Sequence, residues 1–234
     1  MQGCMQHSLN VCLAWVATEM GADSFYEYMQ SFGIGRRTQI DLGGELVYPL
    51  STPDDSGWYP IQLATNSFGQ GVAVNPVQLA TAISAVANDG KMMKPHVLKA
   101  VIQDGKQYDT ALQVLSVPIK AETARTMTAM LVKSLEEESS SALVPGYSIA
   151  GKTGTAEIVT DGKYGIELTN ASFVGWGPAE DPQFLVYVWI EKPKSSPWGS
   201  VVAAPVFSSI VKELVVYLDL PPAQALDSQV ALGN

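Results

Sequence analysis

The chain has 234 residues, of which 47% are hydrophobic and 16% charged, and it contains 20 glycines and 14 prolines. This composition is that of an ordinary mixed globular protein, and it excludes a disordered chain, a collagen and a coiled coil. Lys and Arg number 14 against 23 Asp and Glu, which gives a net charge of −9. Because phosphate binding needs a basic surface, we do not expect nucleic acid as a partner. The length predicts one domain, assigned to residues 1–220, followed by a disordered tail at 221–234.

The sequence supports neither a metal site nor a membrane anchor. Cys4 and Cys12 lie eight residues apart with no histidine or cysteine at metal-ligand spacing beside them. A disulfide and two free thiols both remain open, and we expect no metal and no cofactor. No stretch of about eighteen apolar residues is present, and residues 1–7 lack the regions of a signal peptide. We therefore expect the chain, taken alone, to be soluble and without anchor or signal.

Apolar residues at helical spacing predict helices over residues 9–20, 24–32, 76–90 and 121–138. The polar end of the last of these, residues 136–141, is expected to be solvated. Between the second and third helices, residues 41–75 are rich in glycine and proline. A long irregular segment inside a compact domain often carries function.

The pattern then changes to strands. Residues 148–159, 171–177 and 184–191 are predicted strands, since β-branched and aromatic residues gather there between turn signals. A final helix begins near Pro205 and is predicted to bury Val206, Ile210, Leu214 and Tyr217. Helices followed by antiparallel hairpins and a closing helix describe an α+β domain.

The sharpest local signal is Gly151-Lys152-Thr153-Gly154-Thr155, inside the first predicted strand. Two glycines and a lysine weaken the packing of a strand, which indicates that something approaches its backbone closely. The alternative is a β-bulge with an exposed lysine. The glycines alone do not decide between these interpretations.

A second motif, Ser8-x-Asn10, comes directly before a predicted helix. By itself it is weak, because Ser and Asn are the residues that cap helix N-termini. Ser-x-Asn-like and Lys-Thr-Gly motifs are, however, two members of the three-motif set of penicillin-binding proteins and class A β-lactamases, together with Ser-x-x-Lys. Two of the three occur here, in the right order.

Longer segments extend this agreement. They include Phe-Gly-Ile-Gly at 32–35, Thr-x-Ile-Asp-Leu-x-Gly-Glu at 38–45, Ser-Phe-Gly-Gln-Gly-Val-x-Val-Asn-Pro-Val-Gln-Leu-Ala at 67–80, Ala-Ser-Phe-Val-Gly-Trp-Gly-Pro at 171–178 and Ala-Ala-Pro-Val-Phe at 203–207. From about Gln6 to Leu218 the chain resembles the C-terminal part of the transpeptidase domain of class B penicillin-binding proteins. The resemblance implies an incomplete penicillin-binding protein/serine β-lactamase-like fold, with an antiparallel sheet and flanking helices.

The resemblance also implies a site. Its catalytic residues would be Ser8, Asn10 and Lys152, and its substrate-binding residues Thr153, Gly154 and Thr155. In that family Lys152 would hold the proton network and the substrate's negative charge, and Thr153 would bind the terminal carboxylate. Thr155 would lend its backbone N–H to the oxyanion hole. Ser8 would move a proton to the leaving amine, and Asn10 would hydrogen-bond the substrate's amide.

The family's nucleophilic serine belongs to a Ser-x-x-Lys motif several tens of residues before Ser-x-Asn, and only seven residues precede Ser8 here. The one Ser-x-x-Lys in the chain runs from Ser209 to Lys212, on the closing helix. We interpret it as a decoy, because Ser209 is one step from Ile210 on the predicted core face. The chain is therefore expected to be truncated or split before the catalytic serine and to be inactive alone.

The function implied is part of a peptidoglycan D,D-transpeptidase that cross-links the cell wall by acyl transfer. Its partners would be the D-Ala-D-Ala stem peptide, β-lactams in the complete protein and the missing N-terminal segment. The complete protein would act at the extracytoplasmic face of the bacterial cell membrane. A non-catalytic module that binds cell-wall peptide or a partner is the alternative. A β-lactamase is disfavoured, because residues 41–75 and Gly69-Gln70-Gly71 resemble the transpeptidases.

Overall fold

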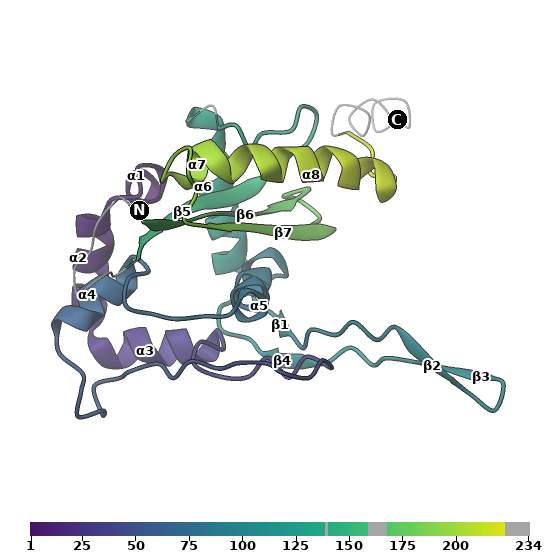
Figure 1. The fold of residues 1–234 in the computed structure, drawn as a ribbon, viewed down its shortest axis with the longest axis horizontal. Helices are drawn as coiled ribbons and strands as arrows, with labels where there is room; N and C mark the ends of the chain where they lie inside the picture. The colour runs from purple at the N-terminus through teal and green to yellow at the C-terminus, as the bar shows by residue number, and fades with distance from the viewer. Residues whose placement is uncertain (139, 159–167, 223–234) are drawn as a thin grey trace. The chain divides into compact units, whose positions relative to one another are not determined.

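A computed structural model of the chain describes residues 1–138, 140–158 and 168–222 (Figure 1). It divides into two compact units, which are described separately. We call Met1–Leu9 with Met127–Asn234 the sheet unit, and Asn10–Thr126 the helical unit. Residues 223–234, most of the predicted tail, lie outside the described residues.

The sheet unit is built on one antiparallel sheet. Its elements are α1 (Gln2–Gln6), most of α6 (Ala121–Glu137), β5 (Ala150–Glu157), β6 (Thr169–Gly177), β7 (Phe184–Glu191), α7 (Gly199–Val202) and α8 (Ala204–Tyr217). The strand order is β5-β6-β7. The β5–β6 register runs unbroken from Ala150 opposite Trp176 to Glu157 opposite Thr169. The three predicted strands are confirmed, and the β-bulge interpretation of β5 is wrong.

The core of the sheet unit lies between α8 and one face of the sheet, as Figure 1 shows. Phe173 of β6 and Phe207 of α8 are fully buried, with their ring centroids 4.6 Å apart. Val188, Val211 and other apolar residues complete the cluster. This packing fixes α8 along the sheet and orients the opposite sheet face away from the helix.

The predicted buried face of α8 is wrong. Val206, Ile210 and Tyr217 are 41%, 42% and 85% exposed, whereas Phe207 and Val211 have no exposed surface. Apolar residues occupy both sides of this helix, so helical periodicity does not select the side that packs. Contact with Phe173 and its neighbours in the sheet selects Phe207 and Val211 instead.

Among the described residues, one helical stretch, Gly199–Tyr217, has the length and apolar composition to cross a membrane. Buried core helices of soluble proteins pass the same test, and 39% of this window is buried inside the structure. The stretch contains α8, whose inner side belongs to the core cluster. Its hydropathy is therefore weak evidence for a membrane span.

The helical unit contains four helices and two two-stranded antiparallel sheets, β1–β4 and the β2–β3 hairpin. They are α2 (Asn10–Met20), α3 (Ala22–Ser31), α4 (Ile61–Ser67), α5 (Pro76–Ala87), β1 (Met92–Met93), β2 (Ala100–Gln103), β3 (Lys106–Asp109) and β4 (Val114–Ser116). As predicted, α5 begins at Pro76, and the Asn75 side chain accepts a 2.8 Å hydrogen bond from the Gln78 N–H. The Gln78 side chain then donates to the carbonyls of Gly33 and Arg36 at 2.9 and 2.7 Å.

The predicted loop-rich segment, residues 41–75, is irregular except for α4. Tyr26 of α3 is 3% exposed and contacts this segment through Trp58. The indole N–H of Trp58 donates to the Tyr26 hydroxyl at 2.8 Å, and the two rings meet edge to face. This irregular segment is therefore held by the contact of Trp58 with a buried tyrosine, and not by the backbone hydrogen bonds of a sheet.

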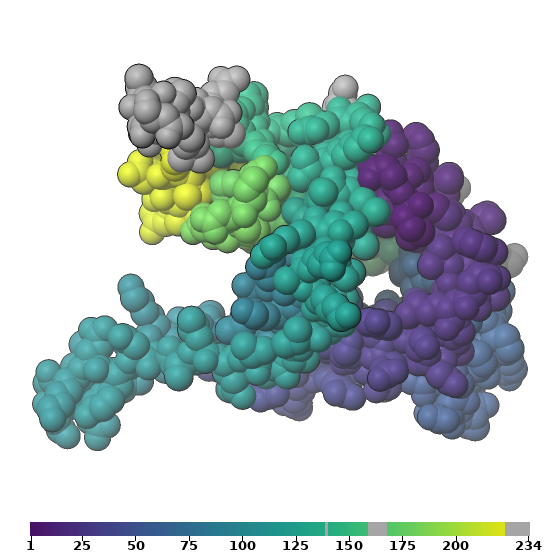
Figure 2. Space-filling view, turned by 180° about the vertical axis from the view of Figure 1, so that it is seen from behind, coloured from purple at the N-terminus to yellow at the C-terminus, as the bar shows by residue number. Residues whose placement is uncertain are grey.

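The β2–β3 hairpin projects from the rest of the helical unit (Figures 1 and 2). Its side chains remain exposed, including Ile102 at 75% and Tyr108 at 56%. At its base, Asp41 accepts 2.9 Å hydrogen bonds from the backbone N–H groups of Val97 and Leu98. These two bonds lower the pKa of the Asp41 carboxyl and tie residues far apart in sequence.

Candidate active site

Lys152 lies on β5 and is half-buried. Its ammonium donates to the Thr153 hydroxyl at 3.2 Å. Burial lowers the pKa of Lys152 below its ordinary value, while the negative charge of Glu138 opposes this shift. A cationic group held in a partly desolvated place is suited to bind an anion or to exchange a proton.

Glu138 follows the C-terminal end of α6, in the polar run that the sequence suggests is solvated. The residue is exposed, which agrees with that expectation, yet its charge acts on Lys152. Sequence reasoning did not find this role, because the two residues lie on different elements and share no motif. Only the folded arrangement of α6 and β5 reveals it.

The protein's own packing requires a glycine at Gly151, whereas at Gly154 the neighbouring group is a hydroxyl that can rotate. A Cβ atom on Gly151 would lie 2.7 Å from the Val174 carbonyl oxygen and 2.9 Å from the Phe173 ring. A Cβ atom on Gly154 would lie 2.5 Å from the hydroxyl oxygen of Ser172. Carbon atoms do not approach so closely without displacement of a neighbour. The predicted close approach to this backbone is confirmed, and the approaching groups come from β6.

Thr155 connects β5 to the segment before α7. Its hydroxyl accepts a hydrogen bond from the Gly199 N–H at 3.3 Å. The role that the resemblance gives to Thr155 concerns its backbone N–H, so the side chain is free to serve this structural contact. Thr155 thereby joins the motif strand to the start of the closing helical region.

Ser8 has a left-handed backbone, with φ of 47°. It follows His7, the C-cap of α1, and the Ser8 and Leu9 N–H groups bond the carbonyls of Met5 and Cys4 at 3.3 and 3.1 Å. This pair of bonds is the Schellman ending of a helix, whose left-handed position is usually glycine. A serine there costs conformational energy, and such outliers cluster at functional sites. The left-handed conformation of Ser8 follows from its place at the end of α1, and a catalytic role for its side chain remains a prediction.

The predicted site residues are divided between the two units. Ser8 and the Lys152–Thr155 run belong to the sheet unit, and Asn10, the first residue of α2, belongs to the helical unit. Within the sheet unit, α1 is tied to α6 through the Gln2 side chain, which donates to the Met130 carbonyl at 3.2 Å. The convergence of Ser8 and Asn10 on the Lys-Thr-Gly strand remains a prediction.

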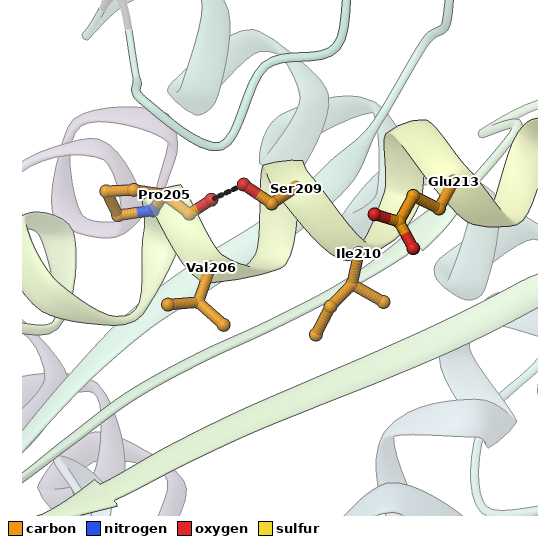
Figure 3. Close-up of a pocket in the computed structure, with 5 residues that line it drawn as sticks. All are labelled: Pro205, Val206, Ser209, Ile210 and Glu213. Carbon is orange, nitrogen blue, oxygen red and sulfur yellow. Dashed lines mark hydrogen bonds between the residues drawn. The ribbon is translucent and has the colours of Figure 1, made fainter.

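Ser209 lies on the outer side of α8, in a shallow pocket with Pro205, Val206, Ile210 and Glu213 (Figure 3). Its hydroxyl donates to the Pro205 carbonyl of the preceding turn at 3.1 Å, a common arrangement for a helical serine. The reason given for the decoy interpretation was wrong, since Ile210 does not face the core. The exposed position and the local hydrogen bond of Ser209 nevertheless support that interpretation.

Two buried polar atoms lie on the sheet face that carries Lys152. By the strand register, Asn170 and Trp176 share this face with Lys152. The Asn170 Oδ1 and Trp176 Nε1 atoms are buried and have no hydrogen-bond partner among the described residues. Because burial of an unpaired polar atom is unfavourable, these atoms call for additional partners on this face.

The structure also bears on metal binding and on the cysteines. Among residues 1–138, 140–158 and 168–222, no group of three His, Cys, Asp or Glu side chains could hold a metal ion. Cys4 and Cys12 are both disulfide-bonded, and neither is a free thiol. From the sequence alone, both a disulfide and two free thiols had remained open.

Residues 1–212 match the family model described as "Penicillin binding protein transpeptidase domain". The match covers most of the chain, and the helices and antiparallel sheet described above agree with the α+β fold of this family. The chain therefore belongs to the penicillin-binding protein transpeptidase family. The family and the fold class predicted from the sequence are confirmed.

Particular relatives narrow the comparison. The chain is 34% identical over 229 residues to Stage V sporulation protein D of Bacillus subtilis. This alignment covers 93% of the chain and 34% of the sporulation protein. Penicillin binding protein 3 of Mycobacterium tuberculosis superposes with a TM-score of 0.85 at 27% identity, over 95% of the chain and 52% of that structure. The transpeptidase domain of penicillin-binding protein 3 from Burkholderia pseudomallei superposes with a TM-score of 0.80 at 29% identity. The superposition covers 95% of the chain and 65% of that structure. The chain thus spans about a third of the sporulation protein.

Proposed function

We propose that this chain is part of a peptidoglycan D,D-transpeptidase that cross-links the cell wall by acyl transfer. The observation that carries the proposal is the Lys-Thr-Gly strand, with a half-buried lysine of lowered pKa, in a chain that matches the transpeptidase family over residues 1–212. The proposed partners are the D-Ala-D-Ala stem peptide and β-lactams. Similarity to a probable peptidoglycan D,D-transpeptidase supports a place on the extracytoplasmic face of the membrane.

The position of β5 in the sheet supports substrate binding there. Within the described residues, β6 is the only strand that pairs with β5, so β5 forms an edge of the sheet. An extended peptide can bind such an edge through backbone hydrogen bonds. The stem peptide would lie along β5, with its terminal carboxylate near Thr153 and Lys152.

The residues divide the chemistry between them. Lys152 would stabilise negative charge and hold the proton network, and the backbone N–H of Thr155 would stabilise the oxyanion. Ser8 would pass a proton to the leaving amine. The nucleophile would be the serine of a Ser-x-x-Lys segment supplied from outside these 234 residues, and its hydroxyl would form the acyl ester as the amine leaves. Without this segment the chain has no covalent route.

A fluorescent penicillin tests the proposal. The 234-residue chain alone should remain unlabelled. Co-expression with a segment that supplies Ser-x-x-Lys, from the DNA ahead of residue 1 or from a relative, should produce a labelled complex. In that complex Lys152→Ala should abolish labelling, because the anion-binding ammonium is lost. Lys212→Ala is the matched control, since this lysine is exposed on α8, and it should leave labelling intact.

Two results would oppose the proposal. If the chain alone is labelled and Ser209→Ala removes the label, the nucleophile lies on α8 and the decoy interpretation fails. If the folded, complemented protein binds stem peptide but never becomes labelled, the non-catalytic binding module is favoured.

A further inference from the structure

The start of α7 lies directly against the backbone of β5 and β6 (Figure 1). Gly199, the first residue of α7, is buried. A Cβ atom on it would lie 2.5 Å from the Gly154 carbonyl oxygen, closer still to the Ser172 carbonyl oxygen, and 3.1 Å from the Ser172 nitrogen. Carbon and oxygen atoms normally meet at about 3.3 Å or more. Because these are backbone atoms of two paired strands, they cannot rotate aside, and only glycine fits at position 199.

Two hydrogen bonds hold the same segment on the sheet. The Gly199 N–H donates to the Thr155 hydroxyl oxygen at 3.3 Å, and the Thr169 hydroxyl donates to the Pro197 carbonyl at 2.9 Å. By the register, Thr155 of β5 and Thr169 of β6 lie on the same sheet face. Residues 197–199 are therefore fastened to both strands at once, at the end of the Lys-Thr-Gly motif.

The contact with Gly199 also shows how the peptide group between Gly154 and Thr155 is turned. Gly154 pairs with Ser172, and both carbonyl oxygens lie within 2.5 Å of the point where the Gly199 Cβ would be. The two carbonyls of the pair therefore point towards each other, between β5 and β6. The Gly154–Thr155 peptide bond is trans, so the Thr155 N–H points the opposite way. It is directed to the edge of β5 that pairs with no strand among the described residues.

We propose that Gly199 is a positioning residue of this site, which fixes the peptide group between Gly154 and Thr155 and thereby the direction of the Thr155 N–H. The catalytic meaning of this contact rests on the function proposed above, in which that N–H stabilises the oxyanion. Gly199 lies 44 residues beyond Thr155 and outside the Lys-Thr-Gly motif. It acts through the backbone of β5 and does not touch the substrate.

The 234-residue chain tests the positioning without substrate or penicillin. In a ¹H–¹⁵N NMR spectrum, Gly199→Ala should displace the amide signals of Thr155 and Ser172 further than any others outside residues 197–201, because the added methyl group pushes on their peptide groups. Ser200→Ala, at an exposed position one residue along α7, is the matched control and should leave both signals in place. Val211→Ala removes buried volume from the same unit and controls for a general loss of stability.

The complemented protein tests the consequence for acyl transfer. Gly199→Ala should slow the first-order step of acylation by a fluorescent penicillin by about tenfold or more, as expected when an oxyanion donor is displaced. The penicillin concentration that gives half the maximal rate should stay the same, because the Lys152 and Thr153 side chains are retained. Ser200→Ala and Val211→Ala should acylate at the native rate at a temperature where they are folded.

The proposal is overturned if the Thr155 signal stays in place in Gly199→Ala, or if Val211→Ala moves it as far. It is also overturned if Gly199→Ala raises the half-saturating concentration and leaves the acylation step unchanged. If Gly199→Ala does not fold, Thr169→Val decides. This variant loses the bond to Pro197 and loosens the same segment, so an unmoved Thr155 signal would refute the proposal. Failure of the native complemented protein to become labelled would refute the proposed function, while the spectra of the chain alone still decide whether Gly199 positions Thr155.

Discussion

The Thr155 hydroxyl and the Gly199 N–H, 44 residues apart in sequence, are joined by a 3.3 Å hydrogen bond. This bond fastens the Lys-Thr-Gly strand to the segment that begins α7. Thr155→Val keeps the shape of the side chain and removes the acceptor, so we expect unfolding to become easier by about 1 kcal/mol. Thr155→Ser keeps the hydroxyl and should lose less. Chemical denaturation of the native chain and the two variants measures the difference. A larger loss in Thr155→Ser than in Thr155→Val would mean that the methyl group, not the hydrogen bond, is what matters.

Ser8 offers a test of strain at the second motif. Glycine adopts the left-handed conformation without the steric cost that serine bears, so Ser8→Gly should raise the free energy of unfolding by about 1 kcal/mol. Ser8→Ala retains the strain and should bring no such gain. If Ser8 acts in proton transfer, both variants should also slow acyl transfer in the complemented protein. A destabilised Ser8→Gly chain would show that the serine side chain supports the fold.

Lys152 predicts a dependence of stability on pH. Its folded-state pKa is lowered by burial below the unfolded value of 10.5. Between these two pKa values the unfolded chain binds more protons, so the free energy of unfolding rises with pH across this window. Relative to Lys152→Met, the native chain should therefore gain stability as pH rises towards 10.5. Glu138→Gln removes the charge that opposes the shift and should begin this gain at lower pH. The prediction is contradicted if the free energy of unfolding of the native chain and of Lys152→Met changes with pH in the same way.

The two sides of α8 can be compared with the same substitution. Val211 is fully buried against the sheet, and Val206 is 41% exposed. Val211→Ala should cost about 2 kcal/mol of stability, from lost burial and the cavity left behind. Val206→Ala should stay within about 0.5 kcal/mol. Denaturant midpoints of the pair decide which side of the helix packs, and the reverse order would restore the orientation predicted from the sequence.

Long elements with strong periodicity could be predicted from the sequence. The predicted strand at residues 184–191 coincides with β7, and the predicted helices correspond to α2, α3, α5 and α6. The short elements α1, α4 and α7 and both two-stranded sheets, β1–β4 and β2–β3, were not predicted. A helix of one or two turns or a strand of a few residues contains too few positions for a period to stand out.

The motif residues could be identified in the sequence, but their neighbours could not. Lys152 and Gly154 belong to a recognisable pattern, whereas Ser172 is simply a polar residue in an alternating strand. Its closeness to Gly154 depends on the register between β5 and β6, which no local pattern encodes. Which side of α8 is buried could not be predicted either, because it depends on contacts with the sheet.

The unbroken register of β5 and β6 limits how this protein can change in length. Gly151 and Gly154 are three positions apart, so they face opposite sides of the sheet, one towards α8 and one towards Ser172. Insertion or deletion of a single residue between them would bring both to one side and force a side chain into the other contact. Gains or losses of single residues between Gly151 and Gly154 should thus be far rarer among viable variants than point substitutions elsewhere in the strand.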